Sequence, residues 1–264
     1  MPVSPDQIRA FQQEGVVLVP GLFAAHVEAL RKGIDRNMAE PGPYASRNEK
    51  PGETGLFFDD YCNWDRIPEF HAVLRDPAII AAAGALMGSA RVQMFHDHVL
   101  VKEPGTSMAT PWHSDGPYYF VEGRQTISFW VPLDPVTDAG LRCVAGSHLW
   151  EKDVLPTRWV SNAAFFEGDY MPVPDPEAEG MTIREWPMQP GDAVAFHFRT
   201  LHGARGNSAA SRRRAFSLRL VGDDAAYVER PGRTSPPYPG HDMRPGQRLR
   251  EDWFPVLSDR SATG

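Results

Sequence analysis

Cysteine is scarce in this chain of 264 residues. Cys62 and Cys143 are the only two, and they do not form a Cys-x-x-Cys pair. This scarcity excludes a disulfide framework like that of small secreted domains, and it excludes a zinc site built from cysteine pairs. We expect two unpaired thiols in the core of a cytoplasmic protein, with one disulfide or one thiolate–metal contact as the alternatives.

Long apolar runs and an excess of positive charge are also absent. No apolar run approaches the roughly 18–20 residues needed to span a bilayer. Residues 1–19 lack the basic start and apolar stretch of a signal peptide. The formal charge of −7 and the pI of about 5.7 disfavour sequence-independent binding to nucleic acid, which needs a positive surface. We therefore expect a cytoplasmic protein with no membrane and no nucleic acid as partner.

Glycine and proline, in contrast, are abundant. The 23 glycines and 25 prolines make up roughly 18% of the chain, against an average near 12%. This excess disfavours a helical bundle, because both residues interrupt helices. It is still below the roughly 25–30% typical of disordered chains. Hydrophobic residues at 42% and aromatic residues at 11% can build a core, so we expect a globular protein rich in turns and strands.

Helix signals lie in the first third of the chain. A helix is predicted to begin after Ser4, with Gln7 at the capping-box position. A short buried strand is predicted over residues 16–19. Apolar residues at three- to four-residue spacing predict a second helix over residues 24–38. Capping and stop signals predict a third helix between Asp76 and Gly88.

After Arg91 the hydrophobic period changes from that of helices to that of strands. Strands are predicted over residues 91–102, 126–133, 193–199 and 213–221, separated by turns rich in glycine and proline. Helices followed by strands indicate a helical flank packed against a β-sandwich or barrel.

The strongest chemical motif is Trp112-His113-Ser114-Asp115-Gly116. In a strand, residues i and i+2 point to the same face, so His113 and Asp115 direct an imidazole nitrogen and a carboxylate oxygen to one point. Together with one distant histidine, such a pair forms the facial triad of non-haem Fe(II) oxygenases. A polar loop or a helix cap is the alternative explanation, because His-x-Asp also occurs by chance.

A third ligand must come from further along the chain, where His197 and His202 follow the turn Pro190-Gly191-Asp192. Gly203 after His202 permits a tight turn near a metal. His197 alternates with Phe196 and Phe198 and suits a core position. We therefore favour His202 as the third ligand.

An arginine follows eleven residues later and begins the last long strand. Arg213 could bind the far carboxylate of a dicarboxylate cosubstrate, because the guanidinium fork binds a carboxylate bidentately. Its flanking residues Arg212 and Arg214 suit a solvated surface. Strand alternation places Ala215, Ser217 and Arg219 on the face of Arg213, and these small and polar residues suit a ligand-lined cavity. Arg214, Phe216, Leu218 and Leu220 share the other face.

Further pieces accompany these motifs in a characteristic order. They are Gly15-Val16-Val17-Leu18, Val101-Lys102-Glu103-Pro104, Trp130-Val131-Pro132-Leu133-Asp134, Gly146-Ser147-His148, His202-Gly203 with Asn207, and Arg213-Arg214-Ala215-Phe216-Ser217. With His113-Ser114-Asp115, they make the chain resemble the phytanoyl-CoA dioxygenase family of Fe(II)/2-oxoglutarate-dependent oxygenases, which includes ectoine hydroxylase. The resemblance implies a mainly β fold with flanking helices, a double-stranded β-helix (cupin-like jelly roll). It also implies Fe(II), 2-oxoglutarate as cosubstrate, and O2.

The resemblance also divides the chain. It implies a single dioxygenase domain over residues 1–264, with a helical flank at 1–90, a jelly-roll core at 91–222 and an irregular covering tail at 223–264.

Site residues follow from the same resemblance. His113, Asp115 and His202 match the iron ligands of the family, and Arg213 matches the arginine that binds the far carboxylate of 2-oxoglutarate. Trp130 and His98 lie where family members line the cosubstrate pocket. His96, Leu100 and Lys102 share the strand face of His98, so any of these residues could reach the cavity. His148 matches a structural turn. Ala145 and Ala204 depart from the family pattern, and Ala204 replaces a serine that helps some members to bind 2-oxoglutarate.

The implied activity is hydroxylation of an unactivated C–H bond of a small molecule, with succinate and CO2 as co-products. The presence of the Asp115 carboxylate favours hydroxylation over the halogenation that related enzymes without it perform. The same Fe(IV)-oxo chemistry could instead give desaturation, epoxidation or cyclisation in secondary metabolism. A non-oxidative cupin-type isomerase is a further alternative.

The substrate is less clearly defined by the sequence. Between Arg199 and Arg250 the arginines outnumber the acidic residues, which favours an anionic substrate as much as a solvated basic face. Arg219 is the best candidate for contacting a substrate carboxylate, and Tyr118 is the candidate for an aromatic wall. Weaker candidates are Arg142, Arg158 and Arg205.

Overall fold

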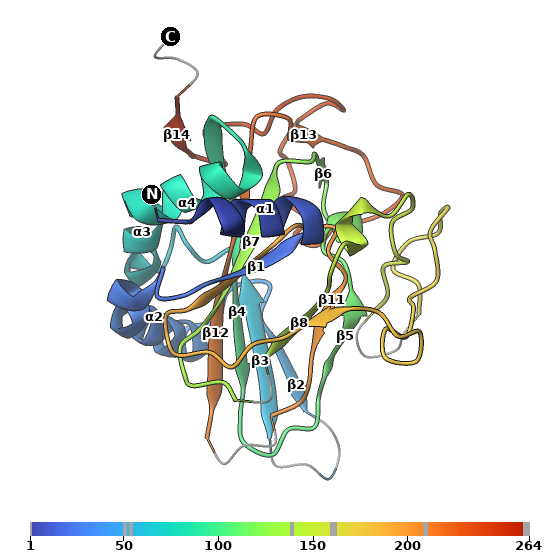
Figure 1. Ribbon diagram of the computed structural model, residues 1–264. Helices are drawn as coiled ribbons and strands as arrows, with labels where there is room; N and C mark the ends of the chain where they lie inside the picture. The colour runs from blue at the N-terminus through green and yellow to red at the C-terminus, as the bar shows by residue number, and fades with distance from the viewer. Residues whose placement is uncertain are drawn as a thin grey trace.

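The computed structural model of the protein describes residues 2–49, 52, 55–137, 140–158, 163–207 and 211–260. Two antiparallel sheets face each other, and helices cover the outer face of the larger sheet (Figure 1). The larger sheet runs in the order β1 (Val16–Val19), β10 (Ala193–Phe196), β7 (Thr126–Pro132), β12 (Arg213–Val221), β4 (Arg91–Lys102), β3 (Leu56–Tyr61) and β2 (Ser46–Glu49), with β14 (Val256–Asp259) also on β4. The smaller sheet runs β5 (Thr110–His113), β11 (His202–Ala204), β8 (Leu141–Val144) and β9 (Ile183–Arg184), and β13 (Ala226–Tyr227) pairs with β6 (Val121–Glu122). This arrangement confirms the predicted mainly β jelly roll with flanking helices.

The predicted helices are present, and their ends have the expected chemistry. Ser4 caps the first helix in a complete capping box with Gln7, and Asp76 caps the fourth through the amides of the first turn. Gly15 and Gly88 end these two helices in the left-handed conformation. The helices are α1 (Pro5–Glu14), α2 (Val27–Ala39), α3 (Pro68–Leu74) and α4 (Pro77–Met87), with 3-10 turns η1 (Ala24–His26), η2 (Gly116–Tyr118) and η3 (Ser147–Leu149).

By length and hydropathy, no single helix in the described part of the chain could cross a membrane. The two helices α3 and α4 reach the required length and hydropathy only as a pair, which bends by 54° between them.

The apolar core lies on the outer face of the larger sheet, beneath the helices, so the inner face can carry the polar residues of a site. On β12, Phe216 and Leu218 point outward into the apolar layer beneath the helices, where the rings of Phe70 and Phe216 lie 4.8 Å apart. Arg213 and Ser217 point inward, into the space between the sheets. The alternation predicted for this strand is therefore confirmed, and it sets the register because a shift of one residue would exchange the two faces.

The structure differs from the expected helical flank over residues 1–90. The strands β2 and β3 lie within it and extend the larger sheet beside β4. The sequence of β3 does not alternate, because Phe57 and Phe58 are followed by two buried carboxylates, Asp59 and Asp60. The Asp60 carboxylate accepts hydrogen bonds from Asn37 Nδ2 and from the amide of Gly42, both at 2.7 Å. Because this carboxylate is buried, the strand does not show the alternation of polar and apolar residues by which strands are predicted from sequence.

Two further segments differ in extent from the sequence prediction. The strand predicted over residues 193–199 ends at Phe196, because the chain then turns: the His197 amide bonds to Gly15 O and the Phe198 carbonyl accepts from the Gly116 amide. The tail from residue 223 is not irregular throughout, since it contributes β13 and β14, and β14 adds to the larger sheet.

Candidate active site and metal centre

One cavity of about 320 Å³ lies between the two sheets. Its wall contains the predicted metal ligands, both predicted cosubstrate-pocket residues, Arg213, and the two main substrate candidates Tyr118 and Arg219. The lining residues are Ser46, Asp59, Tyr61, His96, His98, Leu100, Lys102, Thr110, His113, Asp115, Tyr118, Tyr119, Trp130, Leu141, Thr157, Arg158, Phe165, Phe196, His202, Ala204, Arg213, Ala215, Ser217, Arg219, Ser235 and Pro236.

Three lining residues converge on one point in the smaller sheet. His113 ends β5, His202 begins β11, and the two are direct partners in the antiparallel pairing of these strands. Asp115 follows on the turn into η2. Its Oδ1 lies 3.6 Å from Nε2 of His113 and 3.8 Å from Nε2 of His202. The possible ligand atoms of His113, Asp115 and His202 all lie within 4.8 Å of one another, so among the described residues these three side chains could hold one metal ion.

The hydrogen bonds of both imidazoles prepare them as metal ligands. Nδ1 of His113 lies 2.8 Å from Pro111 O, and Nδ1 of His202 lies 2.9 Å from Thr200 O. Each Nδ1 therefore carries the proton and donates it to a carbonyl, which leaves the Nε2 lone pair directed at Asp115. Burial and the neighbouring His113 lower the pKa of His202 to about 3, so this imidazole is neutral, as a metal ligand must be.

The carboxylate ligand is held by its second oxygen. Oδ2 of Asp115 accepts from Ser128 Oγ at 3.4 Å and from Arg219 Nε at 3.3 Å. Burial alone would raise the pKa of Asp115, but the charge of Arg219 holds it well below its usual value. Asp115 is therefore a charged carboxylate with Oδ1 directed at the two Nε2 atoms. Two imidazoles and one carboxylate suit Fe(II), so the residues present fit the expected ion.

The far end of the cavity carries two buried basic side chains. Arg213 begins β12, and Lys102 is its direct partner on β4. Burial lowers the pKa of Arg213 to about 10, and burial together with the Arg213 charge lowers the pKa of Lys102 to about 6. Within the described residues, the Lys102 ammonium donates to Arg205 O at 3.0 Å and has no carboxylate partner. This end of the cavity therefore suits a ligand carboxylate.

Trp130 and His98 lie between the cationic end and the metal ligands. Ser217 of β12 pairs with His98 on one side and with Trp130 on the other, so the three form one row across the sheet. His98 Nε2 lies 3.5 Å from Asp59 Oδ1 of β3. Burial lowers the pKa of His98. Both predicted pocket residues thus line the cavity, in the same row of the sheet floor.

Tyr118 and Arg219 line the cavity as expected, but their polar groups contact the protein. The Tyr118 hydroxyl donates to Thr157 O and accepts from the Thr157 amide, both at 2.7 Å, so the ring forms a wall while the hydroxyl holds the neighbouring segment. The predicted contact of Arg219 with a substrate carboxylate is not supported by its surroundings, because its charge already faces Asp115.

Two other histidines, His148 and His197, and the two cysteines have structural surroundings. His197 is a core residue, as predicted: Nε2 lies 3.1 Å from Arg124 O, and Nδ1 accepts from the Arg199 amide at 3.0 Å. His148 lies outside the cavity, with Nε2 3.3 Å from Gln12 O. Cys62 and Cys143 are free thiols.

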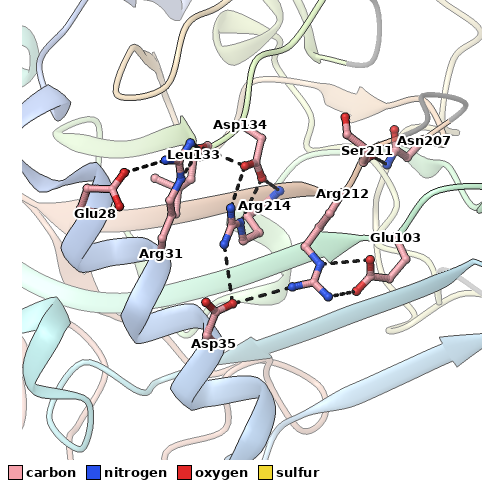
Figure 2. Close-up of polar contacts among 10 residues, drawn as sticks. All are labelled: Glu28, Arg31, Asp35, Glu103, Leu133, Asp134, Asn207, Ser211, Arg212 and Arg214. Atoms are coloured by element: carbon pink, nitrogen blue, oxygen red, sulfur yellow. Dashed lines mark hydrogen bonds and ion pairs between the residues drawn. The ribbon is translucent and has the colours of Figure 1, made fainter.

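The arginines beside Arg213 belong to a surface network, as predicted. Figure 2 shows Arg212 and Arg214 on the outer side of β12, both near Asp35 of α2. Arg214 forms a bidentate pair with Asp134, with N–O distances of 2.8 and 3.1 Å. Arg212 forms a similar pair with Glu103. Alternation along β12 therefore separates one cavity arginine from two surface arginines.

Of the three weaker candidates for contacting the substrate, two form ion pairs away from the cavity and one lines it. Arg142 pairs with Glu177 at 2.6 Å, and Arg205 pairs with Glu185 at 2.6 Å. Arg158 lines the cavity and is exposed. Sequence reasoning gave no role to Lys102 or to Asp59. The face of Lys102 on β4 was readable from alternation, whereas the position of Asp59 depends on the unpredicted strand β3.

A jelly roll that directs two histidines and one carboxylate into a cavity is the architecture of non-haem iron oxygenases. The family model for phytanoyl-CoA dioxygenase (PhyH) matches residues 11–215. The chain belongs to this family, and it is an Fe(II)/2-oxoglutarate-dependent oxygenase by class. Family and site together confirm the expected Fe(II), 2-oxoglutarate and O2.

Solved structures share the fold at low sequence identity. The carbocyclase SnoK from nogalamycin biosynthesis is 24% identical, with a TM-score of 0.75 and coverage of 97% of each chain. The epimerase SnoN, in complex with Fe3+, alpha ketoglutarate and nogalamycin RO, is 24% identical, with a TM-score of 0.73 and coverage of 96% of this chain and 97% of that one. EctD from S. alaskensis, with 2-oxoglutarate and 5-hydroxyectoine, is 22% identical, with a TM-score of 0.68 and coverage of 94% and 87%.

Proposed function

We propose that this oxygenase hydroxylates an unactivated C–H bond of a small molecule, with succinate and CO2 as co-products. The convergence of His113, Asp115 and His202 within one buried cavity carries the proposal. We further propose that residues 1–264 act as a single domain in the cytoplasm. The free thiols fit a reducing compartment, and the pairing of β14 with β4 links the tail to the core.

In this proposal the three ligands hold Fe(II), and the cationic end holds 2-oxoglutarate. When bound, the iron supplies the oxidation of a C–H bond by O2, coupled to the conversion of 2-oxoglutarate to succinate and CO2. Arg213 and Lys102 bind the far carboxylate of the cosubstrate by charge-assisted hydrogen bonds. Lys102 offers the remaining N–H donors of its ammonium, which compensates for the missing serine at Ala204.

Other residues orient these groups and keep water out. Trp130 and His98 flank the path from the cationic end to the ligands. Arg219 fixes the Asp115 carboxylate, so that Oδ1 keeps facing the two imidazoles. The aromatic rings of Tyr118 and Phe165, 5.2 Å apart, cover the substrate side and limit access of solvent.

The test combines cosubstrate binding with turnover. Fe(II) and 2-oxoglutarate are added to the protein without O2, and binding is followed by calorimetry. Succinate release is then measured in air with a library of small molecules, and the product mass is determined. Hydroxylation adds one oxygen, whereas desaturation removes two hydrogens and isomerisation changes neither.

A matched pair of variants makes the test specific. Asp115→Ala should abolish iron binding and succinate release. Asp134→Ala removes a carboxylate of the surface network and should leave both intact. Normal turnover by Asp115→Ala without an added ligand would contradict the assignment of the triad.

A further inference from the structure

The cavity floor contains two buried side chains, each with one polar atom that lacks a hydrogen-bond partner among the described residues. His96 of β4 is the direct cross-strand partner of Arg219 of β12, and both line the cavity. His96 is 2% exposed and Arg219 is 5% exposed. Within the described residues, His96 Nε2 and Arg219 Nη1 have no hydrogen-bond partner. Since directly opposed side chains are about 5 Å apart at Cβ, the two groups can serve one ligand atom.

The two groups have opposite hydrogen-bonding character. Nδ1 of His96 lies 3.1 Å from Asp97 O, so Nδ1 carries the proton and Nε2 is an acceptor. Burial and the nearby Arg219 charge keep the pKa of His96 well below its usual value, so the ring is neutral. Arg219 Nη1 is a donor only, and the charge of the guanidinium is balanced by Asp115 through Nε.

This combination discriminates between functional groups. A hydroxyl can donate to His96 Nε2 and accept from Arg219 Nη1 at the same time. A ketone or an ether accepts only and leaves His96 without a donor. A carboxylate also accepts only, and it directs negative charge at the lone pair of His96 and towards Asp115. Buried polar groups left without partners are unfavourable, so the pair favours a hydroxyl.

The surroundings place such a hydroxyl beside the metal ligands and against aromatic rings. The His96 ring lies edge-on to Tyr119, with centroids 5.2 Å apart, and to Tyr61, with centroids 6.2 Å apart. Arg219 connects the pair directly to Asp115. A carbon skeleton attached to the hydroxyl would therefore contact aromatic walls close to the metal ligand Asp115.

We propose that His96 and Arg219 bind a hydroxyl group of the substrate, and that the substrate is an uncharged alcohol rather than an anion. This inference rests on the proposed function and names the substrate class of the same site. In the free protein, solvent can serve both groups, and a hydroxyl reproduces both hydrogen bonds when it displaces that solvent.

Three probes of one shape test the proposal: indan-1-ol, indan-1-one and indane-1-carboxylate. Their binding to the protein loaded with Fe(II) and 2-oxoglutarate is measured by calorimetry without O2. The alcohol should bind about tenfold more tightly than the ketone, since it gains one further hydrogen bond in a dry site. It should also bind more tightly than the carboxylate.

Variants of His96 separate hydrogen bonding from packing. His96→Phe keeps a ring but removes the acceptor, so the preference for the alcohol over the ketone should disappear while the ketone still binds. His96→Asn restores an acceptor and should recover part of the preference. His148→Phe is the matched control, because His148 is also buried, and its Nδ1 has no partner in the described part of the chain, but it lies outside the cavity. It should keep the wild-type selectivity.

Several results would overturn the proposal. These are equal affinities for the three probes, tighter binding of the carboxylate, no binding of the alcohol, or a preference that survives in His96→Phe. The titrations are repeated with metal-free protein, which retains His96 and Arg219. Selectivity without iron or cosubstrate binding would count against the proposed oxygenase but not against the hydroxyl site. Iron and cosubstrate binding without selectivity would count against the hydroxyl site alone.

Discussion

Replacing Lys102 with methionine should stabilise the ligand-free protein and weaken its binding of 2-oxoglutarate. Lys102 is 2% exposed, and its amino group contacts one carbonyl, at 3.0 Å, and the ring of Phe57, with 4.8 Å between Nζ and the ring centroid. Burial and the adjacent Arg213 lower its pKa to about 6. The folded protein therefore carries an uncharged lysine at neutral pH, in a position where the cosubstrate carboxylate would restore the charge.

The size of the effect follows from proton linkage. The pKa of lysine in the unfolded chain is about 10.4, so between pH 6 and pH 10.4 the unfolded chain binds a proton that the folded protein lacks. The stability contributed by Lys102 therefore rises with pH across this range. At pH 8, protonation of Lys102 in the unfolded chain lowers the free energy of unfolding by about 3 kcal/mol relative to a side chain that never carries a charge. At pH 10 this lowering is less than about 1 kcal/mol. Lys102→Met removes this destabilisation.

The assay is denaturant unfolding of both proteins between pH 7 and pH 10. The variant should be more stable at pH 8, and the difference in unfolding free energy should shrink as the pH rises. Lys152→Met serves as control, because Lys152 has 54% of its side chain exposed and should give no such trend. A stability difference that is absent at pH 8, or constant from pH 7 to pH 10, would refute the reasoning.

Binding of the cosubstrate provides an independent measurement of the same group. If the carboxylate restores the charge of Lys102, wild-type protein takes up a proton when it binds 2-oxoglutarate near pH 8. Calorimetry in two buffers of different ionisation enthalpy detects this uptake. Lys102→Met should bind 2-oxoglutarate about tenfold more weakly, because one charge-assisted hydrogen bond is lost, and should show no proton uptake.

Three further predictions concern the framework of the site. Gly15→Ala should lower the free energy of unfolding by about 2–4 kcal/mol in denaturant titrations, because its φ is +74° and a Cβ would lie 2.4 Å from His148 Nδ1; a loss under about 0.5 kcal/mol would contradict this. Arg214→Met should change that free energy by about 1 kcal/mol or less, since its ion pairs lie near the surface, and a larger change that is insensitive to salt would oppose this view. Tyr118→Phe removes both hydrogen bonds to Thr157, so amide exchange at Thr157 should become faster, and unchanged exchange would show that the segment is held by other contacts.

Local patterns in the sequence are sufficient for the long strands and for the metal ligands. The boundaries of β4 and β12 match the predicted ranges 91–102 and 213–221, because each strand combines a period of two with clear turns at its ends. The distinction between Arg213 and its two neighbours follows from the same alternation. His202 pairs directly with His113 because β5 and β11 are adjacent. This pairing is tertiary, so the sequence indicated His202 through its glycine neighbour and the family pattern.

What the sequence left open depends on contacts between distant segments. The role of Asp59 required β3, whose buried Asp60 accepts hydrogen bonds from α2 and from the loop that follows it. The environment of Arg219 shows the same limit. Its position on the cavity face was predictable, but whether its charge faces a ligand or Asp115 depends on the approach of the smaller sheet.

The pairing register of β12 with β4 positions the cosubstrate end, the middle of the cavity floor and the residues beside the metal carboxylate relative to one another. Its inward residues run from Arg213 at the cosubstrate end, past Ser217 in the middle, to Arg219 beside the metal carboxylate, with Lys102, His98 and His96 opposite them on β4. At about 3.3 Å per residue, the six steps from Arg213 to Arg219 span roughly 20 Å, which separates the carboxylate anchor from the proposed hydroxyl site. A shift of one residue would turn Arg213, Ser217 and Arg219 into the apolar layer below the helices and expose Phe216 and Leu218 to the cavity. Cosubstrate binding, orientation of Asp115 and substrate recognition therefore depend on a single strand pairing, which the apolar face of β12 stabilises.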